Sequence, residues 1–417
     1  MNQATTDYIR QHADADVSQL ALRSAPPEVD VRVALQQIEG RQLAARKMPT
    51  LAAIDGILYP PRLSLEQCSS EQTAMYKKRV IHQLYDLYRQ SHEDSEDLRA
   101  LFCDLTGGFG IDFGNIAPLF LTPTLEQRAI YVERNAELCN LARHNFPLMG
   151  LPRAEVVCAT AEEVLQNDSF WTPSQFVCIL IDPARRDSAG HKVALIEDCT
   201  PDVCALQELL RARAHYTLIK LSPMLDIAAA TRALRNIEAV HVVSVAGECK
   251  ELLLVMGREE RPSEEIPIHC VDLDVTFTFT RQEEAAAPAV YYPPAIPPAG
   301  CYLYEPNASI LKAGAFKSIC QRFPVQKLAL NTHLYVADVL LSDFPGRTWR
   351  VVDTATFNKK ELKRLLCGVE AAELTVRGFP LSVASLRKQF HLREGGTAHF
   401  IATTIGKQKM LLRVERL

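Results

Sequence analysis

The sequence predicts an α/β protein built on an open, largely parallel sheet that helices cover on both faces. Between residues 100 and 257, seven short apolar runs alternate with helical patterns, as in parallel sheets whose strands are joined by helical crossovers. The last two runs, "VHVVSV" and "ELLLVMG", are joined only by "AGECK". That link is too short for a helical crossover, so we expect the last pair of the seven strands to be antiparallel.

The region before the sheet, residues 1–92, is predicted to be helical. Apolar residues at helical spacing mark one helix before Pro49 and a second one between residues 70 and 90. Gln67, Ser69 and Ser70 immediately precede the second helix, where they could line a lid over a ligand or simply cap the helix. We therefore expect an N-terminal helical domain with a lid, followed by the sheet domain at residues 93–262.

The region after the sheet is predicted to form two smaller α+β domains, at residues 263–329 and 330–417. "CVDLDVTFTFTR" alternates with period two, which indicates one half-buried strand, and "EEAAAPAVYYPPAIPPAG" is expected to be a loop or linker. "SILKAGAFKSICQRF" is expected to be one helix, and further strands and helices alternate up to a terminal hairpin.

Charge is unevenly distributed along the 417 residues. The last 77 residues, from Leu341, carry 14 Lys/Arg and 7 Asp/Glu, whereas the rest of the chain carries 32 and 43. A basic module behind an acidic body suggests a polyanionic partner, although a merely solvated basic surface is an equal alternative.

The composition also bears on disulfides, metal sites, membrane spans and secretion. Twelve scattered cysteines without a C-x-x-C pair or a histidine cluster are typical of reduced thiols and predict neither disulfides nor a metal site. No run of about 18 uncharged apolar residues predicts a membrane span, and the N-terminus lacks the pattern of a secretory signal. We therefore expect a cytoplasmic protein with no membrane partner and no metal.

The turn "DLTGGFGID" ends the first predicted strand, at the edge where open α/β sheets bind ligands. Gly108 and Gly110 would let the backbone approach a ligand, but Phe113 breaks the G-x-G-x-x-G pattern of dinucleotide sites. The carboxylate of Asp104 would repel a pyrophosphate and attract an ammonium group. S-adenosylmethionine, which carries an ammonium and a sulfonium and no phosphate, fits these requirements.

The next three strands end in residues that fit the same ligand. Glu133 ends the second strand and could accept hydrogen bonds from both ribose hydroxyls, while Thr160, Ala161 and Glu162 follow the third strand near the expected adenine. The fourth strand ends in Asp182, followed by proline. These residues stand in the order expected of one ligand site along the edge of the sheet.

In this order and spacing the chain resembles class I S-adenosylmethionine-dependent methyltransferases. The blocks "LEQCSSEQTAMYKK", "DLTGGFGID", "IDPARRD", "EDCTPD", "KLSPMLD" and "GECKEL" resemble one bacterial group that carries a ferredoxin-like and a THUMP-like domain after the catalytic domain. The resemblance spans nearly the whole chain, and Thr160 departs from the acid that is commoner beside the adenine. It implies a cofactor site made by Gln67, Ser70, Asp104, Thr106, Gly107, Gly108, Gly110, Asp112, Glu133, Arg134, Thr160, Ala161, Glu162 and Asp182.

"DPARR" resembles the D/N-P-P-[YF] loop of enzymes that methylate planar amino nitrogens, so Asp182, Pro183 and Arg185 are the predicted catalytic residues. The aromatic residue of that loop is missing, and Arg185 could instead stack on a base or hold a phosphate. A carbon-5 pyrimidine methyltransferase would need a nucleophilic cysteine in this loop or after the fifth strand, and neither "DPARRD" nor "KLSPMLD" contains one. Methylation of a base nitrogen is therefore favoured.

THUMP-type domains are associated with RNA, which agrees with the basic C-terminus. We therefore predict methylation of a structured RNA, such as rRNA or tRNA. The alternatives are a non-catalytic RNA-binding protein that kept the fold and a methyltransferase acting on protein or a small molecule. The predicted RNA-contacting residues are Lys220, Ser222, Lys359, Lys360, Lys363, Arg364, Arg377, Arg387, Lys388 and Arg393.

Overall fold

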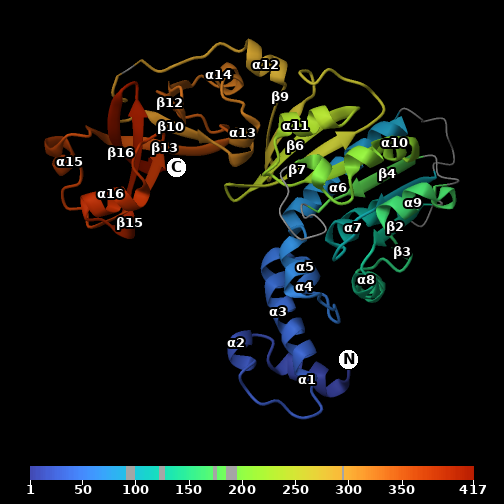
Figure 1. Ribbon diagram of the computed structural model, residues 1–417. Helices are drawn as coiled ribbons and strands as arrows, with labels where there is room; N and C mark the ends of the chain where they lie inside the picture. Colours follow the sequence, from blue (N-terminus) through green and yellow to red (C-terminus); the bar gives the residue numbers. More distant parts are fainter. Residues whose placement is uncertain (91–98, 122–126, 172–175, 185–194, 294) are drawn as a thin grey trace. The chain divides into compact units, whose positions relative to one another are not determined.

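The computed structural model describes residues 1–90, 99–121, 127–171, 176–184, 195–293 and 295–417. The chain divides into two compact units, coloured along the sequence in Figure 1. The first unit contains Met1–Val240 and Lys250–Arg261, and the second contains His241–Cys249 and Pro262–Leu417. Each unit has its own core and is described separately.

The N-terminal part of the first unit is helical, as predicted. Its helices are α1 (Gln3–Gln11), α2 (Val17–Leu20), α3 (Val31–Lys47), α4 (Pro49–Ala52), α5 (Arg62–Gln67) and α6 (Glu71–Gln90). Asn2, Asp16 and Asp30 cap α1, α2 and α3, each through a side-chain oxygen that accepts a backbone N–H of the first turn. The apolar faces of α1 to α3 meet around Tyr8 and Ile38, which are buried.

All seven predicted strands are present. They are β1 (Ala100–Asp104), β2 (Arg128–Glu133), β3 (Glu155–Cys158), β4 (Phe176–Ile181), β5 (Tyr216–Leu221), β6 (Ile237–Val245) and β7 (Glu248–Met256). The strand order in the sheet is β3-β2-β1-β4-β5-β7-β6-β8-β9, so two further strands extend the predicted seven. The pairs among β1 to β5 are parallel, and β7 runs antiparallel to β5.

Short helices connect these strands. They are α7 (Ile111–Ile116), α8 (Ala136–Leu148), α9 (Ala161–Gln166), α10 (Val203–Arg213) and α11 (Ile227–Ala233), with 3-10 turns η1 (Ala117–Leu119), η2 (Asp168–Phe170) and η3 (Ile196–Asp198). The rings of Phe102 and Phe113 stack at 5.8 Å, and Phe113 stacks on Phe146 at 4.9 Å. This aromatic cluster fixes α7 and α8 against β1 and thereby positions the loop between β1 and α7.

Three predictions for the region after the sheet are wrong. The stretch expected to be one strand is a hairpin of β8 (Ile268–Asp272) and β9 (Val275–Phe279), because Leu273 takes a positive φ of 54° and reverses the chain. The stretch expected to be a loop or linker, residues 283–300, overlaps helix α12 (Arg281–Ala286) at its start, because Thr280 and Glu283 form a capping box. A strong local cap outweighed the Ala- and Pro-rich composition that follows it.

The predicted helix "SILKAGAFKSICQRF" is also broken in two, into α13 (Ala308–Ala313) and α14 (Ser318–Arg322), because Gly314 ends α13 at φ 81°. The second sheet has the order β11-β12-β10-β13-β16-β15-β14. Its strands are β10 (Tyr302–Pro306), β11 (Gln326–Ala329), β12 (Thr332–Ala337), β13 (Gly346–Thr356), β14 (Ala371–Arg377), β15 (Arg393–Ile405) and β16 (Gln408–Arg416). Helices α15 (Lys359–Leu365) and α16 (Val383–Phe390) contribute Leu362, Leu365 and Leu386 to its core.

Candidate active site

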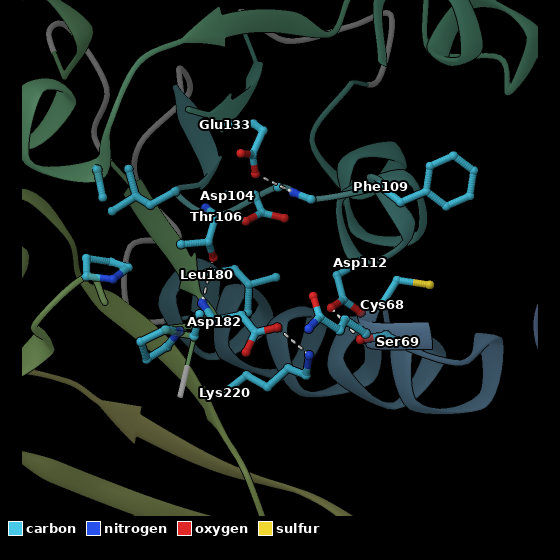
Figure 2. Close-up of a pocket in the computed structure, with 18 of the residues that line it drawn as sticks. Cys68, Ser69, Asp104, Thr106, Phe109, Asp112, Glu133, Leu180, Asp182 and Lys220 are labelled. Atoms are coloured by element: carbon cyan, nitrogen blue, oxygen red, sulfur yellow. Dashed lines mark hydrogen bonds and ion pairs between the residues drawn. The ribbon is translucent and has the colours of Figure 1, made fainter. Parts of the chain in front are cut away.

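A pocket of about 920 Å³ lies at the carboxyl ends of β1, β2, β4 and β5, within the first unit. Figure 2 shows part of the lining. The lining side chains come from the strand ends, from the loop after β1 and from α5. It brings together most of the predicted cofactor residues, namely Gln67, Asp104, Thr106, Gly107, Gly108, Gly110, Asp112, Glu133, Arg134, Thr160, Ala161, Glu162 and Asp182. Pro183, Lys220 and Ser222 line the same pocket.

The glycine turn after β1 packs against aromatic rings on one side and is open on the other. A Cβ at Gly107 would lie 2.1 Å from the Tyr131 ring, and one at Gly110 would lie 2.9 Å from Phe146. A Cβ at Gly108, where φ is +55°, would meet only a carbonyl oxygen at 3.9 Å. Two of the glycines are therefore required for packing, and Gly108 leaves the space that a ligand needs.

Glu133 ties this turn to the end of β2. One carboxylate oxygen accepts a hydrogen bond from the backbone N–H of Gly108 at 3.0 Å, and the other accepts from Asn135 N at 2.8 Å. The side chain is only partly buried and faces the pocket (Figure 2). Its orientation is thus fixed before any ligand arrives, while each oxygen keeps a lone pair free.

Thr106 links the ends of β1 and β4. Its backbone N–H donates to the Asp104 carboxylate at 3.0 Å, and its hydroxyl accepts the backbone N–H of Asp182 at 2.6 Å. Asp104 is 2% exposed, and burial raises its pKa well above the ordinary value. The nearby carboxylates of Asp112 and Asp182 raise the pKa further. In the described part of the chain, no cationic side chain pairs with Asp104.

A buried lysine that the sequence analysis did not identify supports this acidic cluster. The ammonium of Lys77, on α6, lies 2.8 Å from both oxygens of Glu251 and 3.2 Å from an oxygen of Asp112. Ser69 donates to the other Asp112 oxygen at 2.7 Å and contacts the same ammonium at 3.2 Å. The helical spacing indicates that Lys77 is buried, because it lies three residues after Ala74 and four before Ile81, on the buried face of α6.

Lys220 and Asp182 form an ion pair at the ends of the neighbouring strands β5 and β4 (Figure 2). Burial alone would lower the pKa of Lys220, but the carboxylates of Asp182, Asp112 and Glu251 raise it above its ordinary value. The lysine therefore keeps its proton at physiological pH. It is a hydrogen-bond donor in this pocket and not a general base.

The remaining predicted site residues fall into three groups. Thr160 caps α9 through Glu163, so its hydroxyl is engaged within the helix while the residue still lines the pocket. The lid assignment of Ser70 is corrected, because it is absent from the pocket lining and its hydroxyl accepts Thr73 N at 3.3 Å, as a helix cap does. Ser69 is the serine that reaches the site. The predicted catalytic Arg185 lies outside the described residues.

The predicted RNA-contacting residues of the second unit form two sets, arginines that have partners within the unit and lysines that are exposed. Arg364 pairs with Asp353 at 2.5 and 3.1 Å, and Arg377 pairs with the buried Glu305. Arg387 donates to two backbone carbonyls, and Arg393 pairs with Glu370 at 2.8 Å. The four residues that are exposed and make no recorded polar contact with the described residues are Lys359, Lys360, Lys363 and Lys388.

Cysteine, metal and membrane features add little to this site. Among the described residues that line the pocket, the cysteine is Cys68, and burial raises the pKa of its thiol. The described residues hold no group of three or more His, Cys, Asp or Glu side chains placed to bind a metal ion. Within the same residues, no helix combines the length and apolar character that crossing a bilayer requires.

The fold and the site together define a class I methyltransferase architecture, with a glycine turn after β1 and an acid at the end of β2. A model described as a ferredoxin-like domain matches residues 302–345, and one described as THUMP domain-like matches residues 346–416. These ranges place the boundary between the two domains at 345 and 346, whereas the boundary expected from the sequence lies at 329 and 330.

The crystal structure of a putative methyltransferase from Porphyromonas gingivalis W83 is 34% identical to this chain, with a TM-score of 0.81. The match covers 99% of this chain and 97% of that one. The chain therefore belongs to the family of class I S-adenosylmethionine-dependent methyltransferases that carry ferredoxin-like and THUMP-like domains.

More distant structures match only parts of the chain. A SAM-dependent methyltransferase from Agrobacterium tumefaciens is 20% identical over 34% of this chain and 44% of its own, with a TM-score of 0.23. A class I methyltransferase structure from Listeria monocytogenes is 12% identical over 66% of this chain and 94% of its own, with a TM-score of 0.37. No curated protein matches the sequence at a significant level.

Proposed function

We propose that the protein binds S-adenosylmethionine in the pocket of about 920 Å³ and transfers its methyl group to a base nitrogen of RNA. The observation that carries the proposal is Asp104, a buried carboxyl group whose nearest charged neighbours include other carboxylates. A buried carboxyl in such surroundings calls for a cation, and the cofactor brings an ammonium and a sulfonium. The bound cofactor supplies an electrophilic methyl group.

The other lining residues fit the remaining parts of the same ligand. The carboxylate of Glu133 is oriented to accept hydrogen bonds from both ribose hydroxyls. The open space at Gly108 lets the cofactor lie close to the backbone. Thr160 and Glu162 lie at the start of α9, where the adenine is expected. The protein's own contribution to the reaction is to hold the acceptor nitrogen in line with the methyl group.

Two features support RNA as the substrate and nitrogen as the atom that receives the methyl group. The THUMP-like domain carries four exposed lysines on its helices that pair with none of the described residues. These lysines suit a phosphate backbone, which favours RNA over a protein or a small molecule. Cys68, the cysteine of the described lining, is partly buried, and desolvation raises the pKa of its thiol, which favours nitrogen over carbon-5 of a pyrimidine as the acceptor atom. Twelve free cysteines suit a reducing compartment, so we place the reaction in the cytoplasm.

One experiment tests the two parts of the proposal separately. Calorimetry with the full-length protein measures S-adenosylmethionine binding, and mass spectrometry measures methylated nucleosides after incubation with total RNA from a strain that lacks the gene. Binding together with a new methylated nucleoside is the expected result. Failure to bind the cofactor would overturn the whole proposal, whereas binding without RNA methylation would overturn the acceptor alone.

A further inference from the structure

The Lys220–Asp182 pair bears on which base edge the pocket accepts. Figure 2 shows the two side chains pointing toward one another at the ends of β5 and β4, on the side of the pocket opposite Glu133. The Lys220 side chain is 12% exposed and that of Asp182 is 39% exposed, so both are within reach of a ligand. An acceptor base therefore meets a fixed cation and a carboxylate side by side.

Resting on the function proposed above, we propose that Lys220 and Asp182 together recognise a ring N–H that lies beside a carbonyl group, as in guanine or uracil. Asp182 accepts the N–H, and Lys220 donates to the neighbouring carbonyl oxygen. An ammonium group has three N–H donors, so Lys220 can hold the carbonyl without releasing Asp182. The acceptor is then a ring nitrogen and not an exocyclic amine.

The sign of the charge that develops during transfer supports this choice. An exocyclic amine that attacks a methyl group becomes positive, and a neighbouring lysine cation opposes that change. A ring N–H beside a carbonyl instead loses its proton, and the negative charge spreads onto the carbonyl oxygen. A cation held beside that oxygen stabilises the charge where it develops.

The step balances in atoms and charge. The N–H bond breaks and its proton passes to the carboxylate of Asp182. The new N–CH₃ bond forms as the S–CH₃ bond breaks, and the electron pair of that bond stays on the sulfur, which becomes neutral. The carbonyl that carried the partial negative charge returns to its neutral form. No oxidant, reductant or further reactant is required.

The surroundings of Lys220 keep its charge in place. Asp182 faces it from β4, Asp112 from α7 and Glu251 from β7. Lys47 on α3 and Cys68 after α5 also interact with it electrostatically. Lys77 shares Asp112 and Glu251 with Lys220. The direct ion pair with Asp182 is therefore the main interaction that keeps Lys220 protonated.

The first test identifies the product. Full-length protein, S-adenosylmethionine and total RNA from a strain that lacks the gene are incubated, and the nucleosides are separated by mass spectrometry. We expect 1-methylguanosine or 3-methyluridine. An amino-methylated, 2′-O-methylated or carbon-methylated nucleoside would overturn this inference but leave the methylation of RNA standing, whereas unmethylated RNA would overturn the proposed acceptor itself.

The second test uses Lys220→Met, Lys220→Arg and a matched control, Lys78→Met, on α6 outside the pocket lining. Lys220→Met is expected to lower kcat by about 100-fold with KM for RNA changed by less than about threefold. The deficit should shrink as pH rises, because the acceptor then ionises without help. Lys220→Arg should restore part of the rate.

If Lys220 only binds a phosphate, Lys220→Met should raise KM and leave the pH profile of kcat unchanged. That result would contradict the inference. Cofactor affinity, measured for every variant, reports whether the pocket is intact. If Lys220→Met does not fold, the product identity and the Lys220→Arg pH profile still decide between the two roles. The Lys78→Met protein should match the wild type in both kcat and KM.

Discussion

The ammonium group of Lys77 lies 2.8 Å from each carboxylate oxygen of Glu251, and the two residues are 174 positions apart in the sequence. Their side chains are 0% and 4% exposed. The pair joins α6 to β7, Glu251 lines the pocket, and the same ammonium reaches Asp112 at the start of α7. The cofactor site is thereby connected to a buried ion pair.

Removing either charge of this pair should destabilise the protein strongly. Lys77→Met leaves the buried Glu251 carboxylate without its cation, and Glu251→Gln leaves the Lys77 ammonium without that carboxylate. Each change should lower the free energy of unfolding in urea by about 3 to 5 kcal/mol, the range for an uncompensated buried charge. The double variant Lys77→Met, Glu251→Leu should lose less than the sum of the two. Losses below about 1 kcal/mol would show that the pair is solvated.

Asp104→Asn should stabilise the protein and weaken cofactor binding. Burial raises the pKa of Asp104 in the folded protein, so its contribution to stability declines as pH rises from the unfolded value of about 4 toward the folded one. Asparagine has no such titration. At pH 8 we expect a gain of about 1 kcal/mol or more by thermal unfolding, and no gain near pH 4.

The same substitution provides its own control. Calorimetry in two buffers of different ionisation enthalpy should show that the wild-type protein releases a proton when S-adenosylmethionine binds, because the ammonium favours the ionised carboxyl. Asp104→Asn should bind more weakly and release no proton. An unchanged affinity would show that Asp104 does not hold the ammonium.

Glu133→Ala should weaken S-adenosylmethionine binding by about 1.5 to 3 kcal/mol, the range for hydrogen bonds to a charged group. The substitution removes the predicted ribose contacts and also frees Gly108 N and Asn135 N. Glu133→Gln keeps the shape of the side chain and separates charge from packing. If both variants bind in calorimetry as tightly as the wild type, the ribose lies elsewhere.

The strand ends Asp104, Glu133 and Asp182 could be predicted from sequence, because parallel strands bring their carboxyl ends to one edge and the acids follow apolar runs. The Lys77–Glu251 pair could not be predicted, because helical spacing places Lys77 on the buried face of α6 but nothing local couples it to a residue so far along the chain. Ser69 and Ser70 differ by one position, and only the helix start decides which one caps and which one reaches Asp112. Long-range packing determined these outcomes.

Asp182→Asn should reduce methyl transfer by about 100-fold or more while S-adenosylmethionine affinity changes by only a few fold. The side-chain amide has the same size as the carboxylate, and the backbone N–H of residue 182 still donates to the Thr106 hydroxyl. It cannot take a proton from the acceptor nitrogen. Single-turnover methylation of RNA and calorimetry on the same preparation measure both effects, and a near-normal rate would remove Asp182 from the reaction.

The last prediction separates RNA-binding lysines from structural arginines in the THUMP-like domain. Lys359, Lys360 and Lys363 are exposed on α15 and pair with none of the residues that the structure describes. The adjacent Arg364 is held by Asp353 and by the Thr354 carbonyl at 2.7 Å. The lysines are therefore available to phosphates. The arginine already has partners within the domain.

Replacing the three lysines by glutamine should weaken RNA binding and flatten its salt dependence. If each lysine neutralises one phosphate, the slope of log affinity against log salt should become less negative by about 2, at roughly 0.7 per phosphate on single strands. The matched variant Arg364→Gln should change the slope much less and lower the thermal stability instead, because its ion pair with Asp353 is lost. Fluorescence anisotropy with a labelled RNA at several salt concentrations measures the slopes. A triple variant with the wild-type slope would leave α15 as a solvated surface, and the phosphate contacts would have to come from another part of the protein.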